Sequence, residues 1–470
     1  MANVLGGGIS GLSAAYYLSR TVKSPTALFE SSDRIGGWIK STQQPGYIFE
    51  SGPRTIRPAG IKGKNTLQLI ENVGLSDQVR PICASHPAAK NRMIYANGKL
   101  NLLPSAVGDI FKTLPPFSKP LISAVIHDLV TQRNATNLDD ESIYSFTERR
   151  FGREIAEYAI SPMICGICAG DAKRISVKFL MEDIFRNEQK YGGVIRGAIM
   201  NSIFGKKQKD ESVDSQLISR SVQEKWRIYS LAGGLQSLPN TLCSHVQQQT
   251  QTKVHFNAQC TQIKFSPNEV ISTVNNEEFP SNAIISSIPS YKLAGLVRDQ
   301  HPKLSQLLDE IIYVDVATVN IQFDKPNLLE SPGFGFLVPP SVNRPILGVI
   351  FDSDCFDITD HTLLTVMMGG HWFHEKFGAN PSEQHLLDVA LDEIKSILKI
   401  DEVPNQTKVN ILRKCIPQYV VGHRKLVNDI RTYIKDHKLP LFLCGAAYDG
   451  VGVNDVIYSS KMAVNDFLNK

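Results

Sequence analysis

The sequence contains no uninterrupted apolar run of the roughly 18 residues that a membrane-spanning helix needs. It also has little excess charge, because 50 Lys and Arg residues face 46 Asp and Glu residues, a formal net charge of +4 over 470 residues. We therefore expect a chain that does not cross a bilayer. A balance this small also argues against a nucleic-acid partner, for which a basic stripe would be expected.

Cysteine is sparse as well, with eight residues spread between positions 83 and 444. This spread is unlike the disulfide framework of small secreted domains, so we expect most of the thiols to be reduced and packed. Cys165 and Cys168 form a C-x-x-C sequence, but no second pair and no thioredoxin-like context accompany it. We interpret this pair as structural.

Several familiar functional signals are missing. His371 and His374 stand beside Glu375 without the H-E-x-x-H order or a third ligand, so we expect no metal site. No G-x-S-x-G elbow or P-loop occurs, which excludes the commonest hydrolase and NTPase classes. The N-terminus resembles neither a signal peptide nor a transit peptide, so we expect any import to depend on internal information.

The glycine-rich sequence near the N-terminus is the strongest signal present. Val4 and Leu5 lead directly into a segment in which Gly6, Gly8 and Gly11 fill the three glycine places of the dinucleotide-binding fingerprint. Apolar residues at helical spacing follow over residues 12–18, and a second apolar strand, residues 26–29, ends in Glu30. The alternative is a glycine-rich turn without a ligand.

Glu30 strengthens the nucleotide interpretation, because it follows Gly11 by 19 residues. About 20 residues is the usual spacing of the acid that accepts hydrogen bonds from the adenosine ribose. A carboxylate at this place also disfavours the 2′-phosphate of NADP. We predict a strand, glycine turn, helix, strand and acid in that order.

A second glycine-rich turn lies near the C-terminus. It follows a predicted buried strand at residues 441–444 and precedes a predicted helix at residues 453–468. A helix N-terminus offers free amides and about half a positive charge, which suits the negative charge on a reduced flavin. We predict that both ends of the chain hold one long cofactor.

Two further motifs carry a family resemblance. Glu30 is followed by Arg34 and the pair Gly36-Gly37, and residues 49–58 read FESGPRTIRP. This arrangement resembles the superfamily of FAD-binding amine oxidases, phytoene desaturases and protoporphyrinogen oxidases, and within it the animal mitochondrial type of the protoporphyrinogen oxidase family.

The resemblance implies an α/β fold with a discontinuous Rossmann-type FAD-binding domain, an α+β substrate domain and a mostly helical insertion. The predicted boundaries are residues 1–88, 226–292 and 412–470 for the FAD-binding domain, 89–225 for the insertion and 293–411 for the substrate domain. One non-covalent FAD per chain is expected. The predicted FAD-contacting residues are Gly6, Gly7, Gly8, Ile9, Ser10, Gly11, Glu30, Arg34, Gly37, Trp38, Gly52, Pro53, Arg54, Thr55, Cys260, Ala446, Val451, Gly452 and Val453.

The activity that the resemblance implies is the oxidation of protoporphyrinogen IX by O2, with release of hydrogen peroxide, in haem biosynthesis. The flavin would carry the chemistry, so no side chain is named as catalytic. Arg54 stands where the family would grip a substrate propionate, although an arginine beside a cofactor could instead brace the flavin loop. Phe334, Leu337 and Met367 occupy positions that the family places around the tetrapyrrole, although residues of these types are often simply core. The common form has arginine where this chain has Cys165, which puts any cation contact from that loop in doubt.

The insertion has two apolar stripes, at residues 107–114 and 121–129, flanked by Lys112 and Lys119. Such stripes fit either the protein's own core or a membrane interface. The resemblance favours peripheral association with the intermembrane-space side of the mitochondrial inner membrane, and a homodimer is possible. The charged run at residues 205–211 is typical of a solvated loop.

Two other classes stay open. An amine oxidase would need an aromatic cage for a cationic amine instead of a cation for an anion. A non-catalytic relative of the GDP dissociation inhibitors would share the fold without using a flavin.

Overall fold

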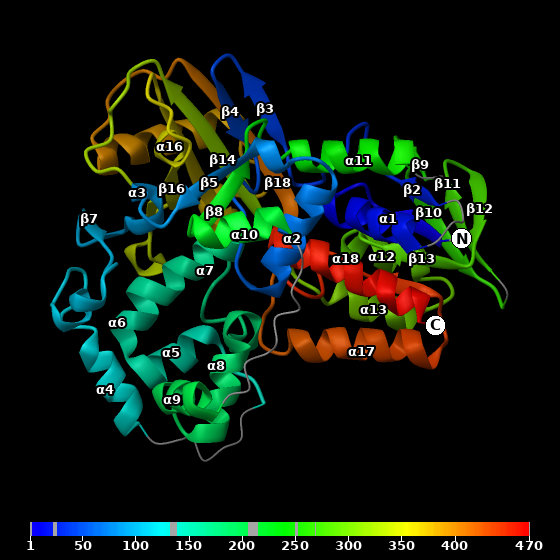
Figure 1. Cartoon of the computed structure of the whole chain (residues 1–470), viewed down its shortest axis with the longest axis horizontal. Coiled ribbons are helices and arrows are strands. Elements are labelled where there is room, and N and C mark those ends of the chain that lie inside the picture. The colour runs from blue at the N-terminus through cyan, green and yellow to red at the C-terminus, as the bar shows by residue number, and fades with distance from the viewer. Residues whose placement is uncertain are drawn as a thin grey trace. The chain divides into compact units, whose positions relative to one another are not determined.

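The computed structural model describes residues 2–21, 26–131, 139–204, 215–249, 252–267 and 269–469. The chain divides into two compact units (Figure 1). The first comprises residues 1–83, 213–312 and 425–470, and the second comprises residues 84–212 and 313–424. The three-part division expected from the sequence stays a prediction, and the charged run at residues 205–211 lies outside the described residues.

The first unit is built on a parallel sheet whose strands come from three distant parts of the chain. The strand order is β19-β13-β1-β2-β9. The bounds are β1 Ala2–Leu5, β2 Ala27–Phe29, β9 Lys253–His255, β13 Ala283–Ser286 and β19 Leu441–Leu443. Every residue of β1 and β13 is buried. This explains why these strands are short apolar runs without alternation, as is typical of parallel strands covered on both faces.

Helices cover this sheet and supply most of the core. The helix α1 (Ile9–Thr21) packs against α18 (Val453–Leu468) and α11 (Ser237–Gln249), and α18 also packs against α2 (Gly60–Asn72) (Figure 1). The remaining helices of the unit are η1 Ser76–Gln78, α10 Gln216–Gln223, α12 Ser290–Val297, α13 Pro302–Asp309 and, across the unit boundary, α17 His423–Asp436. The first and last helices of the chain are therefore neighbours.

Three small antiparallel sheets complete the first unit. The hairpin β3 (Ser41–Gln44) with β4 (Tyr47–Glu50) follows the double glycine, and β5 (Val79–Cys83) pairs with β8 (Trp226–Leu231). The third sheet contains β10 Cys260–Phe265, β11 Val270–Val274 and β12 Glu277–Ser281.

The second unit contains a seven-stranded sheet of order β18-β14-β17-β16-β15-β6-β7. The bounds are β6 Arg92–Ala96, β7 Lys99–Leu102, β14 Tyr313–Phe323, β15 Gly335–Leu337, β16 Ile346–Phe351, β17 Thr362–Gly370 and β18 Gln406–Pro417. All pairs are antiparallel except β15 with β6. The helix α16 (Glu383–Leu398) packs on β14 and β18 and buries the core around Leu386 and Ile394.

A group of helices belongs to the same unit. They are α3 Pro87–Lys90, η2 Val107–Phe111, α4 Ile122–Val130, α5 Ile143–Phe151, α6 Arg153–Ile155, the π-helical segment Ala156–Ile160, α7 Ser161–Cys168, α8 Val177–Tyr191 and α9 Val194–Phe204. Three short helices lie within the sheet region, namely η4 Pro340–Val342, α14 Asp352–Cys355 and α15 Phe373–Phe377. The expected stripe at residues 107–114 forms only a short 3₁₀ turn, η2, over Val107–Phe111.

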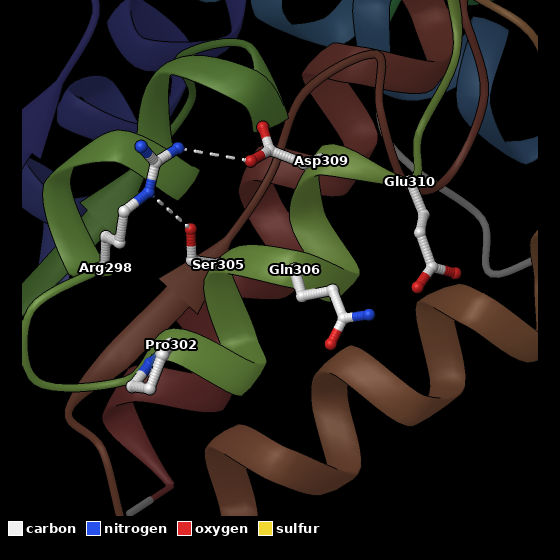
Figure 2. A pocket seen from close by; sticks show the side chains of 6 residues that line it. All are labelled: Arg298, Pro302, Ser305, Gln306, Asp309 and Glu310. Carbon is white, nitrogen blue, oxygen red and sulfur yellow. Dashed lines mark hydrogen bonds and ion pairs between the residues drawn. The ribbon is translucent and has the colours of Figure 1, made fainter.

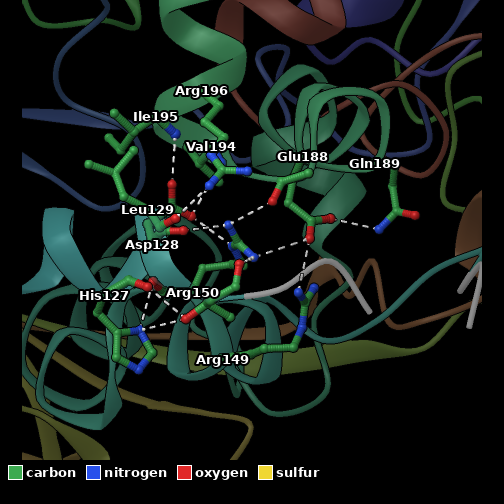
Figure 3. A network of polar contacts seen from close by, with 12 residues as sticks. His127, Asp128, Leu129, Arg149, Arg150, Glu188, Gln189, Val194, Ile195 and Arg196 are labelled. Atoms are coloured by element: carbon green, nitrogen blue, oxygen red, sulfur yellow. Dashed lines mark hydrogen bonds and ion pairs between the residues drawn. The ribbon is translucent and has the colours of Figure 1, made fainter. Parts of the chain in front are cut away.

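A buried ionic network joins four of these helices (Figure 3). The Arg150 guanidinium, fully buried on α5, donates from Nε to Asp128 Oδ1 of α4 at 2.7 Å. The Asp128 carboxylate in turn accepts the backbone N–H groups of Val194 and Ile195 at the start of α9, at 3.2 and 2.8 Å. Glu188 of α8, also fully buried, lies 3.7 Å from Arg150 Nη1. The Arg150–Asp128 ion pair and the nearby Glu188 therefore link α4, α5, α8 and α9.

No described helix combines the length and the apolar character that crossing a membrane requires.

Candidate functional site

The β1–α1 turn has the geometry that its glycines predict. Gly6 has φ of +99°, which side chains rarely allow, and its N–H donates to Phe29 O at 2.9 Å. A Cβ built on Gly11 would lie 1.8 Å from Gly6 O, so any larger residue would push the helix away from the turn. The first and third glycines therefore let α1 begin directly above the end of β1.

Glu30 lies at the carboxyl end of β2 and faces the glycine turn. Its Oε2 accepts the Gly7 N–H at 2.7 Å, and its Oε1 accepts the N–H and Oγ–H of Ser32 at 2.8 and 2.7 Å. A Cβ on Gly7 would lie 2.8 Å from Glu30 Cβ, which accounts for the glycine. The acid expected to meet a ribose is therefore at the crevice where ligands bind in open α/β sheets.

The Arg34-x-Gly36-Gly37 segment meets the first turn along its backbone. Gly36 N donates to Gly7 O at 2.9 Å, and a Cβ on Gly37 would lie 3.2 Å from Gly8 Cα. The Arg34 guanidinium donates through Nη1 to the carbonyls of Ile35 and Ile39, at 3.1 and 3.2 Å, and through Nη2 to Gly37 O. Arg34 thus braces its own loop, so its predicted contact with FAD would come from the N–H groups that remain.

Gly52 fits tightly against the same loop. A Cβ on Gly52 would lie 2.1 Å from the carbonyl oxygen of Trp38, whose side chain is 41 % exposed. Pro53 is exposed, Thr55 is half-buried and Arg54 is only 6 % exposed. The motif that contains these residues therefore places an almost fully buried guanidinium in the first unit.

The C-terminal turn lies beside the N-terminal one. Gly445 follows β19 with φ of +102°, and a Cβ there would lie 3.6 Å from Ser10 Oγ. Ser10 and Ser460, which lie on α1 and α18, share a buried hydrogen bond of 2.8 Å between their hydroxyls. The two turns that the sequence assigns to one cofactor thus lie next to each other.

The start of α18 offers the second helix N-terminus. Gly452 is its N-cap, and Asp455 Oδ2 accepts the Gly452 N–H at 3.1 Å. Val451 and Val453 flank the cap and are half-buried, as is Ala446 within the turn. Lys62 of α2 pairs with Asp455 at 2.7 Å, which holds α2 against this end of the helix.

Cys260 is placed away from the glycine turns, at the first residue of β10. Its thiol donates to Gln262 O at 3.4 Å, and burial raises its pKa to about 11. The nearest link to the acid is Ala258, two residues earlier, whose N–H donates to Glu30 O at 2.8 Å. Backbone two residues before Cys260 therefore contacts Glu30 directly.

The predicted substrate residues Phe334, Leu337 and Met367 belong to the second unit. Leu337 and Met367 both pair with Gly348, so they point to the same face of the sheet. Phe334 precedes β15, and the Arg92 guanidinium lies 5.6 Å from the centre of its ring. The fourth predicted substrate residue, Arg54, belongs to the first unit.

The C-x-x-C pair lies on α7, which packs on that same sheet face. A Cβ on Gly166 would lie 3.1 Å from Leu337 Cδ2, and Cys165 packs in one cluster with Met367. Burial raises the pKa of the Cys165 thiol far above its usual value and that of Cys168 to about 12. All eight cysteines are free, so this pair is two packed thiols and no disulfide.

Two positioning contacts were not anticipated. Ser287, after β13, donates from Oγ to Leu5 O at 2.8 Å and would lie 2.7 Å from a Cβ on Gly6. Glu50, buried on β4, accepts the Leu235 N–H at 2.8 Å and the Ser41 hydroxyl at 2.8 Å. The only sequence signal for Ser287 was its place after an apolar run ended by Pro289.

These residues fit a dinucleotide. Strips of backbone without side chains, at Gly7, Gly8 and Gly37, form a cradle that added Cβ atoms would fill or distort. Glu30 supplies a carboxylate acceptor, and two helix N-termini supply amides and positive potential. No group of three or more His, Cys, Asp or Glu that could hold a metal ion occurs within the described ranges.

Comparisons with known proteins identify the family of the chain. Residues 9–468 match the family described as flavin containing amine oxidoreductase. Protoporphyrinogen oxidases from Bos taurus and Homo sapiens are 37% and 36% identical over 468 residues, which cover 98% of this chain and 96% of each relative. A solved structure from Exiguobacterium sp. 255-15, whose assignment as a protoporphyrinogen oxidase is itself provisional, covers 100% of this chain and 99% of its own, with a TM-score of 0.80 at 22% identity. The chain belongs to the flavin containing amine oxidoreductase family, and within it to the group of its protoporphyrinogen oxidase relatives.

Proposed function

We propose that the chain catalyses the oxygen-dependent, six-electron oxidation of protoporphyrinogen IX to protoporphyrin IX, with hydrogen peroxide as the reduced product. The observation that carries this proposal is the 36–37% identity, across almost the whole chain, to animal proteins named for that activity. Removing six electrons two at a time requires three O2 and yields three hydrogen peroxide molecules for each porphyrin.

FAD supplies the hydride acceptor that no side chain provides. The residues of this chain would bind and orient it. Glu30 would accept hydrogen bonds from ribose hydroxyls, and the backbone at Gly7 and Gly8 would lie against the pyrophosphate. The α18 N-terminus, beyond Gly452, would stabilise negative charge on the ring system.

Arg54 would anchor the substrate. A guanidinium grips a carboxylate through two parallel hydrogen bonds, and these are strong where water is excluded. The side chain of Arg54 is 6 % exposed, so a propionate bound there would be largely desolvated. Anchoring one edge of the macrocycle would restrict its orientation during three successive oxidations, as positioned binding does in general.

The second unit would contribute an apolar surface for the macrocycle. Leu337 and Met367 share one sheet face. Phe334, which precedes β15, is the aromatic residue that we assign to the same ligand. Flat apolar ligands bind through such contact area, while a few polar groups fix their orientation. Cys165, which replaces an arginine of the common form, is a buried thiol and would offer no cation to a propionate.

The helical segment of the second unit would bind the surface of the mitochondrial inner membrane from the intermembrane-space side. On α4 and α9, which pack together, Ile126, Val130, Ile199 and Ile203 are 54, 71, 50 and 64 % exposed. Arg196 is also exposed on α9 and can meet anionic lipid heads. The buried Arg150–Asp128 pair would hold α4 and α9 as one rigid surface (Figure 3). A homodimer on that membrane is part of the same proposal.

Aerobic turnover tests the activity. Purified protein given protoporphyrinogen IX should produce porphyrin fluorescence while consuming three O2 and releasing three hydrogen peroxide molecules per porphyrin. Putrescine, given in parallel, should produce no peroxide above the rate without substrate. Peroxide from putrescine and none from the porphyrinogen would replace this proposal with an amine oxidase.

A further inference from the structure

A cleft in the first unit lies at the end of the central sheet opposite to the glycine turns. Ala283 and Pro440, at the amino ends of β13 and β19, line this cleft. The glycine turns, in contrast, follow the carboxyl ends of the parallel strands. Its volume is about 830 Å³, within the range of small-molecule sites. We call it the β13–β19 cleft, and nothing in the flavin chemistry uses it.

Half of the residues that line the β13–β19 cleft are apolar, and three of these are phenylalanines. Phe442 and Phe467 line it with ring centres 5.5 Å apart, and Leu439 and Phe265 add to the same surface. The Gln300 amide, which also lines the cleft, is already used, since it accepts the Phe265 N–H at 2.7 Å and donates to Phe265 O at 3.1 Å. The Gln300 amide therefore positions the Phe265 backbone, and other groups of the lining remain to contact a ligand.

Two imidazoles form one wall. The ring of His301 lies 5.3 Å from that of Phe265 and 6.0 Å from that of His437, and His437 stacks on Tyr433 at 3.8 Å. His437 Nδ1 lies 2.9 Å from the Tyr433 carbonyl oxygen, so Nδ1 carries the proton and donates, which leaves Nε2 for another partner. Burial, together with the nearby His437, lowers the pKa of His301, so that ring is neutral at physiological pH.

One cation and one anion lie in the lining. Lys438 is exposed, directly after α17, and its ammonium has no ion-pair partner among the residues that the structure describes. Glu269 contributes the one carboxylate of the lining within the same described ranges. Lys438 can therefore pair with the carboxylate of a bound ligand, and the described lining holds no second Lys or Arg to pair with a further negative charge.

A neighbouring hollow over α12 and α13 lacks this character (Figure 2). Its cation, Arg298, already lies 3.4 Å from both Asp309 and Ser305 Oγ, and apart from Pro302 its other lining residues are polar. Of these two hollows in the described part of the chain, only the β13–β19 cleft combines an unpaired cation with aromatic and apolar side chains.

We infer that the β13–β19 cleft binds a planar aromatic monocarboxylate, whose ring lies between the phenylalanines and the imidazole wall and whose carboxylate pairs with Lys438. Apolar burial would supply most of the binding, and the ion pair would select the anion over a neutral analogue. The inference does not depend on the proposed porphyrinogen oxidation, because the residues involved are remote in the sheet from the flavin turns.

The test uses FAD-loaded protein and 1-naphthoate as probe, with 1-naphthalenemethanol as its neutral analogue, in calorimetric titrations. Lys438→Glu should weaken naphthoate binding by roughly tenfold and leave binding of the alcohol within about twofold. Lys435→Glu, the same charge reversal at an exposed residue of α17 outside the cleft lining, should change neither affinity beyond that range.

Three results would overturn the inference: no saturable binding of naphthoate, equal affinity in Lys438→Glu and the unaltered chain, or equal weakening by Lys435→Glu. Folding of each variant is checked by its flavin content and thermal midpoint, which should match those of the unaltered chain because both lysines are exposed.

Discussion

The hydroxyls of Ser10 and Ser460 are 2.8 Å apart in a fully enclosed hydrogen bond, although 450 residues separate them in the sequence. Ser460 Oγ also donates to Ser10 O at 2.8 Å. The last helix of the chain, α18, is therefore bound to the first turn of α1. This contact places the C-terminal glycine turn beside the N-terminal fingerprint. The flavin site therefore depends on both ends of the chain.

Gly11→Ala should abolish most flavin retention. The added Cβ would lie 1.8 Å from Gly6 O, a backbone atom that cannot move aside without displacing the turn. We expect flavin content after purification to fall at least about tenfold, since the shift removes amide contacts worth roughly 1–3 kcal/mol each. Absorbance spectra of the purified variant measure this.

Gly295→Ala is the matched control for that change. Gly295 lies in α12, and a Cβ there would meet nothing within 4 Å. Alanine in a helix interior should leave flavin content unchanged and stabilise the fold by about 0.5–1 kcal/mol. Equal flavin content in Gly11→Ala and Gly295→Ala would remove the role assigned to the turn.

Glu30→Gln should weaken FAD binding without unfolding the turn. The amide oxygen can still accept the Gly7 N–H, but the NH2 group in place of Oε1 cannot accept the Ser32 N–H. The charge that strengthens hydrogen bonds to ribose hydroxyls is lost as well. We expect a loss of about 1.5–3 kcal/mol in FAD affinity, measured by titrating flavin-free protein. Asp33→Asn, at an exposed acid three residues on, should have no effect, and a loss of the same size there would point to general electrostatics.

Arg54→Ala should separate substrate binding from cofactor binding. If Arg54 grips a propionate, KM for protoporphyrinogen IX should rise by roughly tenfold or more while flavin content is retained. Steady-state kinetics at fixed O2 give kcat and KM for protoporphyrinogen IX. Arg57→Ala, at an exposed arginine of the same segment, should leave KM unchanged. Loss of flavin with an unaltered KM would instead assign Arg54 to the flavin loop.

Val130→Asp combined with Ile203→Asp should reduce binding to vesicles that contain anionic lipids. These side chains are 71 and 64 % exposed on α4 and α9, and a carboxylate is strongly disfavoured in an apolar interface. Sedimentation with vesicles should show at least about a tenfold loss of bound protein. Val403→Asp, at a residue that is 85 % exposed elsewhere in the same unit, is the control. Vesicle binding that survives the double change would place the membrane contact on another surface.

The local geometry of the site and the approach of its two terminal glycine turns could be predicted from the sequence, but individual contacts between distant segments could not. Gly6, Gly8, Gly11 and Glu30 act within one strand-turn-helix-strand segment, so their spacing alone predicts their geometry. Ser287 contacts the same turn from 281 residues away, and its place after a short apolar run does not reveal this partner.

Arg34 and the apolar stripe at residues 107–114 show two further limits of prediction from the sequence. A guanidinium near a double glycine fits a phosphate or a carbonyl equally well, and the structure places carbonyls around Arg34. The apolar spacing at residues 107–114 is helical, but the segment forms only η2. Spacing alone does not make an α-helix, because most helical stability in proteins comes from tertiary packing.

The most direct test of the account is an anaerobic titration of the FAD-loaded chain with protoporphyrinogen IX, followed by visible absorbance. The account predicts that the flavin band is bleached, that three flavins are reduced for each porphyrin formed, and that admitting O2 restores the band. A flavin that stays oxidised with excess protoporphyrinogen, or a chain that cannot be loaded with FAD at all, would contradict it.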